Sequence, residues 1–160
     1  MPELSNKLYY PAFALTMFIF TLAFVPRKDI KTLFWFSLIW GSGVDMFLIL
    51  LFRLLNLYQY VNAMPFDFYG SPLFINLSWS PAIILFLYFL PKRPEWYVFP
   101  LYLFAFGIIG TTIGVFLNNA QLIKEIHWNE LFRFPVIVLW FWASSWHYHI
   151  LKLGKEKAQW

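Results

Sequence analysis

The segment from Lys31 to Arg53 (KTLFWFSLIWGSGVDMFLILLFR) limits the folds open to this chain, because it is an apolar run with one acid, Asp45, well inside it. As a helix, residues 32–52 are long enough to cross a bilayer core of roughly 30 Å. An ionised carboxylate near the middle of such a helix costs about 2.5 to 3.5 kcal/mol on insertion scales. We therefore expect Asp45 to face protein or water, sheltered by the other helices of the chain.

The composition excludes an ordinary soluble domain. Of the 160 residues, 61% are hydrophobic, 24% are aromatic and only 12% are charged, whereas soluble domains are about 45–50% apolar and about 25% charged. The basic residues behind the net charge of +4 stand between apolar blocks, so we expect no nucleic-acid partner. The sequence has no cysteine, which excludes disulfides, thiolate metal sites and cysteine nucleophiles.

Apolar blocks of about twenty residues predict an all-α fold, a polytopic membrane bundle of five transmembrane helices. The predicted spans are about 8–25, 32–53, 72–90, 96–117 and 131–151. The basic cluster of Arg27, Lys28 and Lys31 follows the first span instead of preceding it, which favours a retained helix over a signal peptide. No repeat or linker divides the sequence, so we expect a single integral membrane domain over residues 1–160.

The basic residues also predict the orientation of the bundle. With five spans, the first loop, the third loop and the C-terminus share one side of the membrane. That side holds eight of the twelve bases, namely Arg27, Lys28, Lys31, Lys92, Arg93, Lys152, Lys155 and Lys157. Because Lys and Arg are enriched on the cytoplasmic side, we expect a multi-pass protein of the cell membrane with its N-terminus outside and its C-terminus in the cytoplasm.

Small residues predict where the helices approach one another closely. In the second span, Gly41-Ser42-Gly43 allows a close contact and a local bend. Ser37, Gly41 and Asp45 recur every four residues and share one face, which we expect to point into the bundle. In the fourth span, the GTTIG motif at residues 110–114 predicts a second close packing surface.

Two of the segments between spans are longer than a turn. Asn56 to Ser71 is aromatic, with one acid and no base; it is either a loop at headgroup depth or a lid over a pocket. The segment at residues 121–130 (QLIKEIHWNE) has mixed charge and an apolar spacing compatible with a short surface helix.

Polar residues from several helices fall in the outer half of the predicted bundle, when depth is counted at about 1.5 Å per residue. The candidate ligand-binding residues are Asp45, Asn76, Ser78, Thr111, Asn118 and Arg133. Their convergence predicts an outward-facing polar pocket. The alternative is a set of separate interhelical hydrogen bonds, each contributing about 0.6 to 2 kcal/mol.

Within this pocket, Asp45 must either pair with a base or take up a proton. We expect Arg133 as the partner, because it comes from another helix at a similar level, whereas Arg53 lies two turns along the same helix. A buried ion pair would fix the helix register. Ligand binding or proton-coupled chemistry at Asp45 is the alternative.

The sequence predicts no metal site, no catalytic site and no cofactor. His147 and His149 are two residues apart, which on a helix directs them about 200° from each other, and His127 is predicted on the other side of the membrane. A Ser-His-Asp set would have to join Asp45 and Ser78 in the outer half with histidines in the inner half. No zinc-protease motif or phosphate-binding glycine loop is present.

The end of the chain, IHWNELFRF followed by WHYHILKLGKEKAQW, resembles the C-terminal part of a family of small multi-pass membrane proteins from spore-forming Firmicutes. That family also shows a His/Gly-Trp-Asn segment before its last helix and an aromatic-His-Tyr pattern after it. The chain differs by having His149 where the family usually has a base. The resemblance implies a bacterial cell membrane and this topology, and it carries over no functional residue.

Taken together, these patterns favour a non-enzymatic membrane protein. We expect it to contact membrane lipids and to bind a lipid, a small ligand or a partner subunit, such as a second copy of the chain, in the polar pocket. The alternative is a membrane enzyme or a proton-coupled carrier that uses Asp45. Carriers usually show repeat symmetry or paired broken helices, and five unrepeated spans give that alternative little support.

Overall fold

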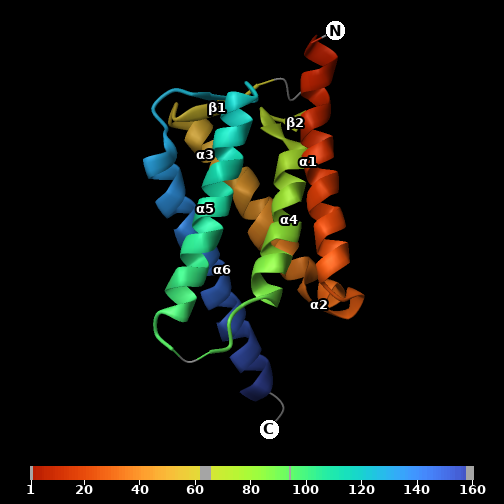
Figure 1. Ribbon diagram of the computed structural model, residues 1–160, viewed down its shortest axis with the longest axis vertical. Coiled ribbons are helices and arrows are strands. Elements are labelled where there is room, and N and C mark those ends of the chain that lie inside the picture. Colours follow the sequence, from red (N-terminus) through yellow and green to blue (C-terminus); the bar gives the residue numbers. More distant parts are fainter. Residues whose placement is uncertain (1, 62–65, 94, 158–160) are drawn as a thin grey trace.

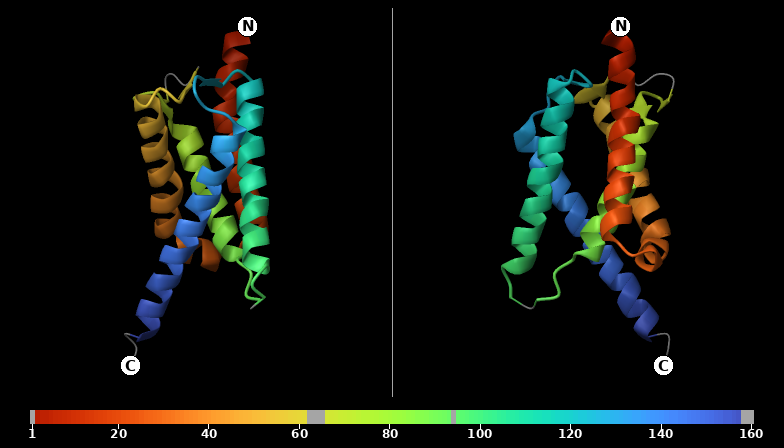
Figure 2. Two further views of the ribbon diagram at one scale, coloured as in Figure 1. Left: turned by 90° about the vertical axis from the view of Figure 1, so that its left-hand side faces the viewer. Right: turned by 45° about the vertical axis from the view of Figure 1, so that its right-hand side comes forward.

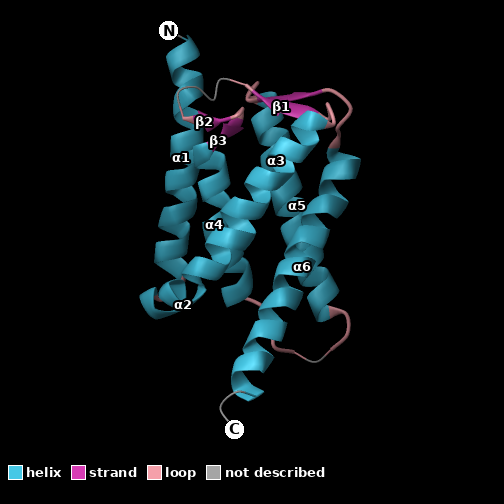
Figure 3. Cartoon of the chain, turned by 180° about the vertical axis from the view of Figure 1, so that it is seen from behind, coloured by secondary structure: helices cyan, strands magenta, loops and turns pink. Residues whose placement is uncertain are grey.

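The computed structural model describes residues 2–61, 66–93 and 95–157. The protein is all-α, with 76% of its residues in helices, and two short antiparallel sheets lie at one end (Figure 3). The helical elements are α1 (Pro2–Phe24), α2 (Arg27–Ser37), the π-helical turn η1 (Leu38–Gly43), α3 (Val44–Leu54), α4 (Leu73–Tyr88), α5 (Val98–Asn119) and α6 (Glu130–Lys157). The strands are β1 (Tyr58–Tyr60), β2 (Asp67–Phe68), β3 (Ser71–Pro72) and β4 (Ile123–Glu125).

Within the described residues, α2, η1 and α3 form one continuous helix. Together with α1, α4, α5 and α6 it runs along the long axis of the molecule, and each such passage is called a crossing here (Figures 1 and 2). Successive crossings are antiparallel. The N-terminus, the loops after α3 and the loop after α5 lie at one end, which we call the sheet end. The α1–α2 turn, the α4–α5 connection and the C-terminus lie at the other, the basic end (Figure 1).

The glycines of the second crossing bring its backbone against α4, as the sequence predicts. Gly41 is buried, and a Cβ added there would come within 2.6 Å of the backbone of Ser80. The π-helical turn contains Gly41, and Ser42 Oγ and Ser80 Oγ are hydrogen-bonded at 2.6 Å. Ser37 and Asp45 are buried on the same face. The predicted inward-facing stripe is therefore confirmed.

The GTTIG motif packs against α6, also as predicted. A Cβ at Gly110 would lie 3.0 Å from Ile137, and one at Gly114 would lie 2.6 Å from Arg133. Gly107, one turn earlier on α5, faces Val138 in the same way. The absence of side chains at these three positions allows the close packing of α5 on α6.

Two apolar clusters fill the bundle. The one toward the basic end is built around Phe86 and Phe141, whose ring centroids are 4.7 Å apart. The one toward the sheet end includes Ile49, Ile75 and Leu122, all of them almost fully buried. The second cluster joins the helices to the strands, so the sheet end is packed as part of the bundle.

The strands at the sheet end correct one prediction. Residues 121–130 were expected as a short surface helix, but β4 forms there and pairs with β1, with Gln59 opposite Lys124. The α5–β4 turn places Gln121 at a φ of 57°, outside helical geometry. The hydroxyl of Tyr10 on α1 donates to the carbonyl of Val61, just after β1, or to that of Leu122, just before β4 and 2.9 Å away. Pairing satisfies backbone groups that a short isolated helix would leave to solvent.

The last helix also differs from its predicted bounds. The predicted span covers residues 131–151, whereas α6 runs from Glu130 to Lys157. Its final residues protrude beyond the other helices at the basic end (Figure 2). The other predicted spans agree with α1, with α2–η1–α3, with α4 and with α5 to within several residues at each end.

The surface of the molecule is apolar along its length, which favours association with a membrane. Two helices are long and apolar enough to cross one, Arg27–Leu54 and Val98–Asn119. Only 28% and 22% of their most apolar stretches is buried in the protein, whereas the core helix of a soluble domain would bury most of that surface. The apolar helices at 8–24 and 73–88 are shorter.

The contact between Gly41 and Ser80 can be tested with a matched pair of alanine substitutions. We expect Gly41→Ala to lower the free energy of unfolding by roughly 1–3 kcal/mol, because its Cβ must displace the backbone of α4. Gly43→Ala is the control, since its Cβ would meet an atom only at 3.7 Å and alanine favours helix. The thermal unfolding of both variants in detergent measures the difference. Equal stability would show that the two helices are not in close contact.

Candidate functional site

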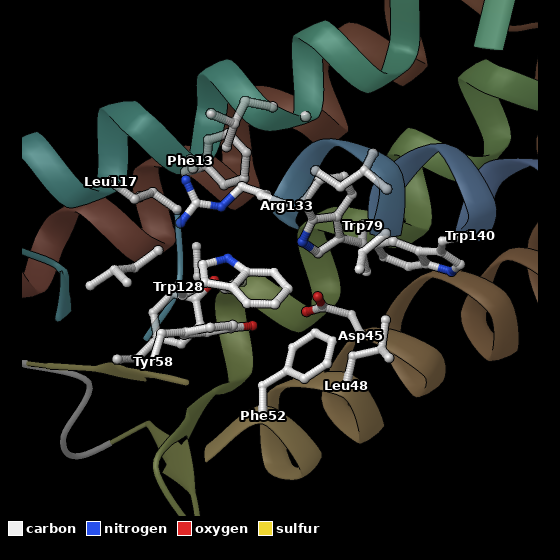
Figure 4. A pocket seen from close by; sticks show the side chains of 18 residues that line it. Phe13, Asp45, Leu48, Phe52, Tyr58, Trp79, Leu117, Trp128, Arg133 and Trp140 are labelled. Atoms are coloured by element: carbon white, nitrogen blue, oxygen red, sulfur yellow. The ribbon is translucent and has the colours of Figure 1, made fainter. Parts of the chain in front are cut away.

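A partly open cavity of about 70 Å³ lies among α3, α4, α5 and α6, below the β1–β4 sheet. Its lining combines many aromatic rings with one acid, Asp45, and one base, Arg133 (Figure 4). It occupies the part of the bundle where the sequence predicts a polar pocket.

Aromatic side chains from separate elements form much of the wall. Trp79 comes from α4, Trp140 from α6, and Trp128 from the segment between β4 and α6. The rings of Trp79 and Trp140 have centroids 5.0 Å apart, and those of Phe52 and Trp128 have centroids 4.8 Å apart. These contacts between rings hold the wall in a fixed shape.

Asp45 projects from α3 into this cavity. The residue is only 7% exposed, and its Oδ2 is buried without a hydrogen-bond partner among the described residues. In Figure 4 its carboxylate lies between the rings of Trp79 and Phe52, and the ring of Tyr58 extends toward it. Buried polar atoms nearly always have a partner, so this oxygen is available to a bound molecule.

Arg133 does not pair with Asp45, and this corrects the expected ion pair. Its guanidinium forms a salt bridge with Glu125 at the end of β4, and Asn118 Nδ2 donates to the other oxygen of Glu125 at 3.2 Å. The chain turns back between β4 and α6, which brings Glu125 over the first turns of α6. A second nitrogen of the guanidinium, Nη1, is buried without a partner in the described structure.

Trp128 supplies a third polar atom that has no partner. Its indole Nε1 is buried and makes no hydrogen bond within the described part of the chain. The ring lies between Arg133 and Tyr58 in the view of Figure 4. One carboxylate oxygen and two N–H donors, all buried and without a partner in the described segments, therefore border the same cavity.

Tyr58 and Tyr60 on β1 line the cavity on the side of the sheet. Burial raises the pKa of the Tyr58 hydroxyl above its usual value; the charge of Asp45 raises it further and that of Arg133 lowers it in part. Burial also raises the pKa of Tyr60, with Tyr58 and Asp45 adding to the effect. Both hydroxyls therefore stay protonated and neutral. The position of β1 favours the lid interpretation of the aromatic loop, of which residues 62–65 lie outside the described chain.

The remaining predicted site residues lie near the cavity without lining it. Asn76 is buried and exchanges hydrogen bonds with Ser71, and Ser78 donates to the carbonyl of Phe74 in its own helix. Asn118 supports Glu125. The hydroxyl of Thr111 is buried without a partner among the described residues, beside the lining residue Gly110. Asp45 and Arg133 are thus the two predicted residues that the fold brings to the cavity.

Sequence reasoning missed several residues that complete the site. Glu125 and Trp128 both belong to the segment predicted as a short surface helix. The alternation in Tyr58-Gln59-Tyr60 is typical of a short strand with two rings on one face, and that signal could have placed these tyrosines together. For Glu125 and Trp128 the sequence holds no comparable signal, because both depend on the β1–β4 pairing.

The histidines belong to a different part of the molecule. His147 accepts a hydrogen bond at Nδ1 from Trp40 Nε1 at 2.8 Å, in the aromatic packing toward the basic end. His149 is exposed on the same helix. Among the described residues, no three acids or histidines lie together as a metal site.

The pairing of Arg133 with Glu125 predicts different effects on stability for two isosteric substitutions. Glu125→Gln should lower the free energy of unfolding by about 3 to 5 kcal/mol, because it leaves the buried charge of Arg133 without a counter-ion. Asp45→Asn should not destabilise the protein, since it removes a buried charge and no hydrogen bond. Unfolding in detergent compares the two variants. A loss at Asp45→Asn as large as that at Glu125→Gln would contradict the assignment of Glu125 as the partner of Arg133.

Comparisons with known proteins identify no relative of this chain. No family model matches it, and neither a curated protein nor a solved structure matches it. The cavity and its unpartnered polar atoms are therefore the basis for the functional argument.

Proposed function

We propose that the protein is a non-enzymatic, five-pass membrane protein that binds a small ligand in the cavity beside Asp45. One observation carries this proposal. The cavity holds buried, unpartnered polar atoms of Asp45, Arg133 and Trp128. Leaving such atoms without partners costs about 1–3 kcal/mol each, and more for charged groups, so a molecule that satisfies them would bind favourably.

Five membrane passes are supported by the arrangement and the surface of the helices. The five crossings are antiparallel (Figure 1), and exposed apolar side chains occur on the helices of all of them. At 1.5 Å per residue, the 23 residues of α1 and the 22 of α5 are long enough for a bilayer core. α4 has only 16 residues and is the most buried helix, so neighbouring helices separate much of it from lipid.

The orientation follows from the charges at the basic end. Arg27, Lys28, Lys31, Lys92, Arg93 and Lys152 belong to the segments at that end, where the C-terminus also lies. The positive-inside rule then places this end in the cytoplasm. In this orientation the cavity belongs to the outer half of the bundle and the β1–β4 sheet covers it from outside.

Cysteine labelling tests the orientation on a chain that has no cysteine of its own. Lys28, Lys92 and Lys124 are all exposed, the first two near the basic end and the third on β4. We expect Lys28→Cys and Lys92→Cys to resist an impermeant thiol reagent in intact cells, while Lys124→Cys reacts. The opposite labelling pattern would show that the orientation in the membrane is the reverse of the one proposed. Reaction at all three positions would exclude the five-pass arrangement.

A small ligand is favoured over a partner subunit or a bilayer lipid as the occupant of the cavity. Asp45 and Arg133 are each only 7% exposed, so a protein surface could not reach them without opening the bundle. The sheet and its tyrosines close the outer side. A partner subunit or a second copy could still bind elsewhere, on the apolar faces of the helices.

The enzyme or carrier alternative has less support. Asp45 has no hydrogen-bonded base among the described residues, and the predicted site contains no nucleophile beside it. His147 is engaged with Trp40 toward the basic end. General acid–base catalysis needs its groups within hydrogen-bond reach of one another and of the substrate.

Native mass spectrometry of the protein extracted with its membrane tests the proposal. Val136 lines the cavity, whereas Leu139, also on α6, is 60% exposed and does not line it. We expect a retained small molecule in the wild type and in Leu139→Phe, and its loss in Val136→Phe, because the larger ring fills the cavity. The proposal fails if the wild type retains no molecule, or if Val136→Phe retains it as well as Leu139→Phe does.

A further inference from the structure

We infer that the ligand of this cavity is an organic ammonium ion whose charged group sits against Asp45 among the aromatic rings, and which carries a neutral hydrogen-bond acceptor for Arg133 and Trp128. This inference rests on the proposed function and specifies the chemical class of the ligand. It is carried by the charged groups, the aromatic rings and the polar atoms without partners among the described residues, all of which border one cavity.

When Asp45 is ionised, the charges around the cavity do not balance without a cation. Arg133 and Glu125 neutralise each other in their salt bridge. Asp45 is the remaining charged group that lines the cavity, and none of the described bases is paired with it. A buried carboxylate without a counter-ion is costly. A singly charged cation in the cavity compensates it, whereas an anionic or neutral ligand does not.

The rings beside Asp45 suit an ammonium ion in particular. Trp79 and Phe52 lie on either side of the carboxylate in Figure 4, and Tyr58 extends toward it from β1. The faces of Trp, Tyr and Phe attract cations, and cages of such rings recognise quaternary ammonium groups. Hard metal cations bind about six or more oxygen ligands. The cavity offers one carboxylate and few further oxygen atoms, so it suits a metal ion less well.

The unpartnered donors define the rest of the ligand. Arg133 Nη1 and Trp128 Nε1 each need an acceptor. Because Glu125 already supplies the negative charge for Arg133, a neutral oxygen is sufficient, such as a hydroxyl or an ester carbonyl. An amino alcohol or its ester carries both an ammonium group and such an oxygen. Choline is a commercially pure probe of this class.

Calorimetric titration of the purified protein in detergent tests the inference directly. The probes are choline, 2-aminoethanol and 3,3-dimethylbutan-1-ol, the last being a neutral molecule of the same shape as choline. We expect at least one of the two ammonium probes to bind ten-fold or more tightly than the neutral alcohol. The inference would be overturned if neither ammonium probe binds more tightly than the neutral alcohol, or if neither shows saturable binding.

Two aspartate variants locate the charge that selects the cation. Asp45→Asn should reduce the affinity for the bound ammonium probe at least ten-fold and leave that for the neutral alcohol unchanged. Asp67→Asn is the matched control, because Asp67 accepts a hydrogen bond from Gly70 in the β2–β3 turn and does not line the cavity. Unchanged affinity in Asp45→Asn would overturn the inference. If Asp45→Asn does not fold, the comparison of choline with its neutral analogue in the wild type still decides.

The failure of this inference is distinguishable from the failure of the proposed function. If the wild type and Leu139→Phe retain a molecule that Val136→Phe loses, but no ammonium probe binds selectively, the cavity binds a ligand of another class. If Val136→Phe weakens the binding of choline as strongly as Asp45→Asn does, the ammonium site and the cavity are the same.

Discussion

The contact between Gly114 and Arg133 places the charged part of the site. A Cβ at Gly114 would lie 2.6 Å from the arginine side chain, so only glycine leaves room for that side chain between α5 and α6. Arg133 can then lie almost fully buried, with one nitrogen bound to Glu125 and another at the wall of the cavity. Helix packing in a membrane depends on such small residues, because lipid provides no hydrophobic drive for helices to associate.

The small sheet covers one side of the cavity. β1 and β4 come from segments more than sixty residues apart. The hydroxyl of Tyr10 on α1 lies within hydrogen-bonding distance of the carbonyl that follows β1 and of the carbonyl that precedes β4. This pairing brings the tyrosines of β1 and the acid at the end of β4 to the same region. The sheet therefore supplies the aromatic cover and also the counter-ion of Arg133. Without that counter-ion, the arginine would compete with a bound cation for Asp45.

The two acids, Glu125 and Asp45, have different roles because only Glu125 pairs with Arg133. Glu125 neutralises the arginine, which keeps a buried positive charge from opposing a cationic ligand. Asp45 is left without a partner among the described residues, beside rings that attract cations. A direct pair between Asp45 and Arg133 would have satisfied both charges within the protein and left little for a ligand to do. The corrected pairing is thus what turns a structural feature into a candidate binding site.

The sequence by itself determined the helical class, the number and approximate bounds of the helical crossings, and the glycine contacts. These features depend on residues near one another in the chain. The length of each apolar block indicates a helix of about that length, and small residues that recur every three or four positions share one face of the helix. It also identified Asp45 and Arg133 as the charged residues to explain. Only the tertiary structure decided which acid pairs with Arg133, and that Tyr58 and Trp128 face the same cavity. Those relations depend on the pairing of β1 with β4, and two short strands far apart in sequence carry too little local preference to reveal their partner.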